Sequence, residues 1–154
     1  LCFACPHPNE PIGAMTMIAM AEIFGAHPEI LEETGFTWRL IPCIDFGHLY
    51  ARSLGREDGE EAMARILDKM AAALGNERAS RFHSHFSHIE FTPKGGEKCH
   101  RTFQDDGGYG PDWTPLARQV ALRSWSPTFI CESAGTQAED AQTMQQMYRA
   151  ARNA

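Results

Sequence analysis

The sequence lacks a hydrophobic segment long enough to cross a membrane. No apolar run approaches the ~20 residues that a spanning helix requires, and the apolar start at residues 1–4 is far too short for a signal peptide. The chain also has no excess of positive charge, because its 14 Lys and Arg residues and 20 Asp and Glu residues give a net charge of −6. We therefore predict a cytoplasmic protein that has no membrane partner and no general attraction to nucleic acid, although a basic groove on an acidic protein stays compatible with this charge.

Two common cofactor motifs are missing as well. No Gly-x-Gly-x-x-Gly follows the first apolar run, which disfavours a dinucleotide-binding fold. Cys2 and Cys5 form a single Cys-x-x-Cys pair, whereas a zinc ribbon needs a second such pair. The five cysteines are odd in number and irregularly spaced, which is typical of a thiol-reducing compartment.

The chain does contain apolar runs that alternate with helical patterns. We predict strands at residues 1–6, 39–45, 81–86 and 127–132. We predict helices at residues 14–24 and 57–74, a third helix that begins at Pro111, and a last helix that ends at about Arg152. A long loop is predicted over residues 87–111. This alternation predicts parallel strands with helices outside them, in either an open doubly wound sheet or part of a (β/α)₈ barrel. A whole barrel needs about 250 residues. We therefore interpret residues 1–154 as a single domain of four βα units, the C-terminal half of a TIM-barrel type fold.

Each predicted strand is followed by side chains that can bind a metal ion. These side chains are Glu10, Asp45 with His48, His85, and Glu132. Because the carboxyl ends of parallel strands face the same way, we expect these groups to converge on one pocket. Carboxylates with neutral imidazoles suit Zn²⁺ or, as an alternative, Mn²⁺. Such an ion lowers the pKa of bound water to about 7 and stabilises charge on a phosphoryl or carbonyl oxygen.

The stretch of residues 81–100 holds four of the seven histidines. Strand alternation places His83 and His85 on one face, and His85, which is nearer the strand end, is the preferred ligand. His100 closes the glycine-rich loop that follows and is positioned to fold back over the pocket. The basic residues of this loop are read either as a solvated surface or as a phosphate clamp. They are Lys94, Lys98 and Arg101.

These residues resemble a known family. The sequence Asp45-Phe-Gly-His48, the residues His85 and His100, and the sequence Ile130-Cys-Glu-Ser133 are similar to the endonuclease IV family, which is AP endonuclease family 2 of the xylose-isomerase-like barrels. The likeness runs from about Glu10 to the end of the chain. It is closest to bacterial proteins described as endonuclease IV-like barrel proteins.

The resemblance implies a zinc-dependent hydrolase that cleaves DNA at abasic sites through a trinuclear metal centre. It implies that Glu10 bridges two metals and that Asp45 and His85 bind one of them. It assigns the third metal to His48, His100 and Glu132. Glu10 and Glu132 would also position the attacking hydroxide. The family's third metal takes an aspartate where this chain has Lys98, and the sequence leaves open whether the adjacent Glu97 substitutes for it.

Two other functions stay open at this point. A sugar or sugar-phosphate isomerase or epimerase would hold one divalent ion with Glu10, Asp45, His85 and Glu132, and the two glutamates would act as acid and base. His100 favours the nuclease, because a one-metal enzyme has no use for it. The last alternative is an inactive fragment that lacks an N-terminal half, and its open sheet edge would favour self-association.

Overall fold

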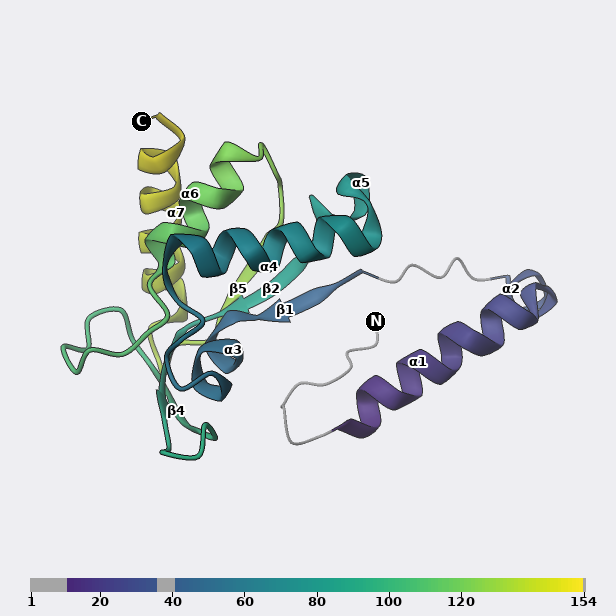
Figure 1. Cartoon of the computed structure of the whole chain (residues 1–154), viewed down its shortest axis with the longest axis horizontal. Coiled ribbons are helices and arrows are strands. Elements are labelled where there is room, and N and C mark those ends of the chain that lie inside the picture. The colour runs from purple at the N-terminus through teal and green to yellow at the C-terminus, as the bar shows by residue number, and fades with distance from the viewer. Residues whose placement is uncertain (1–10, 36–40, 154) are drawn as a thin grey trace. The chain divides into compact units, whose positions relative to one another are not determined.

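The computed structural model describes residues 11–35 and 41–153 of the chain (Figure 1). These residues belong to two units, Leu1–Leu40 and Ile41–Ala154, which are described separately. The predicted strand at residues 1–6 and the predicted ligand Glu10 lie outside the described residues. None of the described helices is long and apolar enough to cross a membrane.

The first unit contains two helices. Helix α1 spans Pro11–Ala26 and confirms the helix predicted at residues 14–24. Helix α2 spans Pro28–Thr34, within a stretch whose structure the sequence left uncertain. Proline at the first position suits a helix start, and Gly35 ends α2 in the left-handed conformation with a φ of 64°.

A three-stranded parallel sheet forms the centre of the second unit. Its strands are β1 (Cys43–Asp45), β2 (His83–Phe86) and β5 (Thr128–Cys131), in the order β1-β2-β5. The register places Asp45 opposite His85 and His85 opposite Ile130. These three strands confirm the positions predicted from the apolar runs, and the shared register brings their carboxyl ends to one edge of the sheet.

Helices cover one face of this sheet (Figure 1). They are α4 (Gly59–Leu74), the short α5 (Asn76–Ala79), α6 (Trp113–Leu122) and α7 (Gln137–Asn153). Phe82, which directly precedes β2, and Phe86 of β2 are fully buried in one core cluster with Leu67 of α4 and Leu116 of α6. The alternate residues of the strands point to the opposite face, where Cys43, Thr128 and Ile130 are exposed.

Two elements that sequence reasoning missed lie next to the sheet. Helix α3 (Phe46–Arg52) begins directly at the end of β1. Strands β3 (His88–Phe91) and β4 (Glu97–Arg101) form an antiparallel hairpin, so the prediction of a continuous loop over residues 87–111 was wrong. The Pro-Lys-Gly-Gly sequence that indicated a loop is its turn, in which Gly95 has a φ of 76° and donates its N–H to Thr92.

The predicted half of a TIM-barrel type fold was wrong. Among the described residues, the strands form a three-stranded parallel sheet and a separate antiparallel pair, and no barrel is present. Four alternating βα units would have placed every strand in one parallel sheet. The chain instead follows β2 at once with the hairpin, which pairs within itself and does not extend the sheet.

Candidate metal centre

Three potential ligands meet at the carboxyl end of the parallel sheet, and we call them the strand-end cluster. Asp45 ends β1, its register partner His85 lies near the end of β2, and Glu132 follows β5. His85 Nδ1 lies 2.9 Å from Glu132 Oε1 and 3.9 Å from Asp45 Oδ2. One ligand atom from each residue lies within 4.8 Å of the others, so one ion can contact all three.

The carboxylate of Asp45 divides its two oxygens between different tasks. Its Oδ1 accepts the backbone N–H of His48 at 2.9 Å and thereby caps the start of α3. Its Oδ2 is buried and lies 2.7 Å from Nδ1 of His48, which forms an ion pair with it when this histidine is protonated. A buried carboxylate oxygen is costly unless a cation or a hydrogen-bond donor compensates its charge, and the imidazole of His48 is placed to do so.

Three further ligands gather where α3 meets the hairpin, and we call them the hairpin cluster. His48 lies in the first turn of α3, and Glu97 and His100 lie on β4. The Glu97 carboxylate contacts Nε2 of both histidines, at 2.7 Å for His48 and 3.2 Å for His100. Ser87 Oγ lies 2.6 Å from Nδ1 of His100 and leaves Nε2 directed at Glu97.

A bulge in β4 explains why Glu97 and His100 reach the same cluster. In the hairpin, Phe91 pairs with Glu97 and Glu90 pairs with Cys99, so Lys98 is the extra residue. In a regular strand without a bulge, Glu97 and His100 are three positions apart and would lie on opposite faces. The bulge brings both to the face that meets α3, while Lys98 contacts Glu90 on the other side.

Close packing of α3 against the hairpin depends on Gly47. A Cβ atom at this position would lie 2.7 Å from Cγ1 of the buried Ile89 and 3.1 Å from the carbonyl oxygen of Ser87. Any larger residue would therefore push α3 away from β3. Glycine lets the helix approach closely enough for His48 to contact Glu97.

The charges around His48 strongly favour its protonated form in the absence of metal. The contact with Asp45 is the main cause that raises the pKa of His48 from 6.5 to about 9, burial lowers this pKa, and Glu97 raises it further. A metal ion that binds Nε2 of His48 must displace a proton. The negative charge of Asp45 and Glu97 that holds this proton also attracts a divalent cation.

The two clusters fit zinc better than magnesium or calcium. Each offers imidazole nitrogen together with carboxylate oxygen, whereas the other two ions prefer oxygen ligands alone. Three protein ligands leave a fourth tetrahedral position for water or substrate, which is the arrangement of catalytic zinc sites.

Five of the six predicted metal ligands are brought together by the structure, and the sixth, Glu10, lies outside the described residues. The grouping differs from the one that the resemblance implied. Glu132 joins Asp45 and His85 and does not join His48 and His100. Glu97 takes the third place beside these two histidines, a question that the sequence left open.

The predicted phosphate clamp does not point into either cluster. Lys98 and Arg101 both form ion pairs with Glu90, and Lys94 is exposed in the turn of the hairpin. Glu90 partly neutralises the charges of Lys98 and Arg101, so these two side chains stabilise the hairpin. A role in binding phosphate remains a prediction.

Replacing Glu90 with Gln is expected to destabilise the protein in a pH-dependent way. Hydrogen bonds from Lys98 and then Arg101 hold the pKa of Glu90 at about 2, below its ordinary 4.5. A lowered pKa in the folded state stabilises the protein above pH 4.5, and this stabilisation is lost as the pH falls towards 2. Urea midpoints of wild type and variant should differ at pH 7 and converge in acid. The exposed Glu61→Gln should match wild type throughout, and a difference independent of pH would contradict the prediction.

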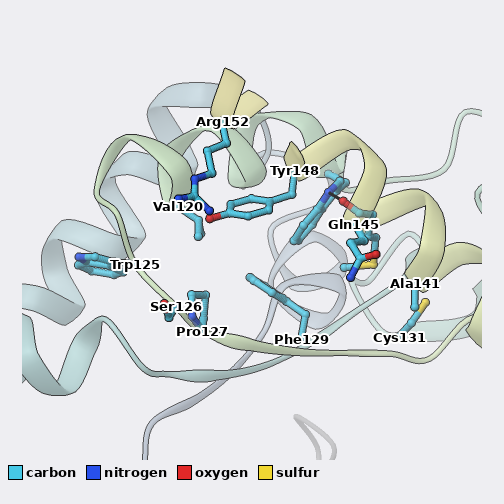
Figure 2. A pocket seen from close by; sticks show the side chains of 12 residues that line it. Val120, Trp125, Ser126, Pro127, Phe129, Cys131, Ala141, Gln145, Tyr148 and Arg152 are labelled. Atoms are coloured by element: carbon cyan, nitrogen blue, oxygen red, sulfur yellow. Dashed lines mark hydrogen bonds between the residues drawn. The ribbon is translucent and has the colours of Figure 1, made fainter. Parts of the chain in front are cut away.

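A cavity of 580 Å³ lies elsewhere, between β5, α6 and α7. Figure 2 shows Phe129 of β5 and Tyr148 of α7 lining it, with Arg152 beside Tyr148. Cys131 also lines this cavity, whereas the next residue, Glu132, belongs to the strand-end cluster. Neighbouring residues of a strand face opposite ways. The cavity is therefore on the helix-covered face and does not supply the substrate pocket of the clusters.

The parallel sheet and the two clusters place the candidate site where ligands bind in many α/β proteins, beyond the carboxyl ends of the strands. The sequence is 35% identical over 98 residues to an uncharacterized protein of Methanocaldococcus jannaschii. The matched region is 64% of this chain and 34% of that relative, so the match spans about a third of the relative's length. No family model matches the sequence. No solved structure matches it either.

Proposed function

We propose that the protein is a divalent-metal-dependent hydrolase of the endonuclease IV type that cleaves phosphodiester bonds at abasic sites in DNA. The observation that carries the proposal is the pair of adjacent three-ligand clusters, which Asp45 and His48 join through a contact of 2.7 Å. Two-metal sites are common in enzymes that cleave phosphate esters, because the ions stabilise both the attacking and the leaving oxygen. The sequence resemblance around Asp45, His85, His100 and Glu132 supports the same chemistry.

The residues of the clusters would divide the work as follows. Bound zinc supplies a water of lowered pKa and an electrostatic partner for the phosphoryl oxygens. Glu132 has a partly exposed side chain and lies where it can accept a proton from, or orient, the attacking water. His48 and His100 present Nε2 towards Glu97, and Ser87 holds His100 in that orientation. We also propose that the protein is cytoplasmic, in line with the free thiols of Cys43, Cys99 and Cys131.

A single-metal sugar isomerase or epimerase is the second candidate. The strand-end cluster alone favours it, because Asp45, His85 and Glu132 are three of the four residues that such an enzyme needs. The hairpin cluster has no role in that reaction. We prefer the hydrolase for this reason, and the number of metal ions distinguishes the two.

The test is metal analysis of the purified protein together with nicking of DNA that contains an abasic site. We expect at least two zinc ions per chain in wild type, loss of an ion in Glu132→Ala, and nicking that depends on metal. A matched pair on β2 provides the control, because His85→Gln should lose metal, whereas His83→Gln alters a residue of the same face outside both clusters. One ion and no nicking would favour the isomerase. No stoichiometric metal would contradict both enzymes and leave an inactive fragment.

A further inference from the structure

We propose that Asp45 supports both metal sites at once, as a ligand in the strand-end cluster and as the residue that positions His48 in the hairpin cluster. This inference rests on the proposed function, because it requires that metal ions occupy the two clusters. It assigns two roles to one carboxylate group. The resemblance assigns Asp45 only to one metal.

The position of Oδ2 between two imidazoles is the first observation. This oxygen lies 2.7 Å from Nδ1 of His48 and 3.9 Å from Nδ1 of His85, and each of these histidines belongs to a different cluster. It is also buried. A ligand position in the strand-end cluster would satisfy its charge there. Because the same oxygen lies close to Nδ1 of His48, it would still influence the hairpin cluster.

The use of the two nitrogens of His48 is the second observation. Nδ1 faces Asp45, and Nε2 faces Glu97 at 2.7 Å in the hairpin cluster. Histidines that bind metal through one nitrogen usually have a carboxylate or carbonyl at the other, which fixes the ring orientation and makes the ligand more basic. Asp45 occupies that place for His48. His100 receives comparable support from Ser87.

The backbone ties the two roles together. Oδ1 of Asp45 caps α3 by accepting the N–H of His48, so the same side chain sets the backbone and the ring of this histidine. Asn is as good a helix cap as Asp but carries no charge. Asp45→Asn should therefore keep the fold and the cap while it removes the charge that both clusters use.

The experiment measures zinc affinity by competition with a chelating dye in five variants and wild type. Glu97→Gln should lose the hairpin ion alone, and Glu132→Gln should lose the strand-end ion alone. Asp45→Asn should weaken both ions. Adding Asp45→Asn to the Glu132→Gln variant isolates the hairpin site, where removing such a supporting group costs about 10–100-fold in affinity. Asp58→Asn, which alters the cap of α4 outside both clusters, should bind zinc like wild type.

The outcomes separate this inference from the proposed function. If wild type binds two ions and the hairpin ion keeps its affinity in the double variant, Asp45 serves one cluster only and the inference is overturned, while the proposed function stands. If wild type binds no zinc, both are overturned. Circular dichroism of each variant confirms that a lost ion does not reflect a lost fold, and an Asp45→Asn variant with native spectrum and two weakened ions supports the inference.

Discussion

Removal of divalent metal by a chelator is expected to lower the midpoint of thermal unfolding by roughly 15 °C for each ion lost. A ligand that binds only the folded state stabilises it by about 4 kcal/mol when its free concentration is 1,000 times the dissociation constant. Bound ions would also neutralise the carboxylates of Asp45, Glu97 and Glu132, which lie in the two clusters. Melting curves of zinc-loaded and chelator-treated protein measure this difference directly.

The control for this prediction is a protein that cannot hold the ions. A variant with His48→Gln and His85→Gln removes one nitrogen ligand from each cluster, and its melting temperature should not respond to zinc or to the chelator. His83→Gln should respond like wild type. Equal melting temperatures for zinc-loaded and chelator-treated wild type would contradict metal binding in both clusters.

The strand-end cluster could be predicted from the sequence because it depends on short-range rules. Asp45 and His85 each lie near the end of an apolar run, and parallel strands align such ends at one edge. The structure confirms that Glu132 follows the third strand of this sheet. Its grouping with Asp45 and His85, in place of His48 and His100, depends on three-dimensional distances that strand order does not determine.

Only part of the hairpin cluster could be predicted from the sequence. His48 and His100 stood out by their residue type, but residues 87–111 were interpreted as a loop. Strands β3 and β4 are only four and five residues long and are separated by proline and two glycines, so their pattern is weak. The place of Glu97 depends on the bulge at Lys98, and a bulge is a property of two paired strands.

The barrel prediction failed for a related reason. Alternating strands and helices indicate parallel pairing, and β1, β2 and β5 do pair in parallel. Closure into a barrel depends on how many strands join the sheet and on their tilt, and neither is contained in the local pattern. The residues that carry the chemistry depend on the strand ends and on the hairpin. Within the part of the chain that the structure describes, they come together without a closed barrel.

Replacing Glu97 with Gln is expected to reduce nicking of abasic DNA at least about 100-fold, which corresponds to about 2.7 kcal/mol of transition-state stabilisation. Glu97 is the single carboxylate of the hairpin cluster and contacts both of its histidines. The amide of Gln is nearly isosteric but neutral, so the hairpin ion should be lost while the strand-end ion remains. Metal content and single-turnover nicking rates, measured on the same preparation, separate the loss of an ion from a loss of folding.

The matched control is the next residue, Lys98→Gln. Lys98 is the extra residue of the bulge and pairs with Glu90, away from the histidines. Its replacement should leave both ions bound, and the nicking rate should change much less than in Glu97→Gln. The opposite result would be loss of the hairpin ion in Lys98→Gln and its retention in Glu97→Gln. The register of β4 would then have to differ from the one described, with Lys98 in place of Glu97 beside His48. The pair of variants therefore tests the position of the bulge as well as the role of the carboxylate.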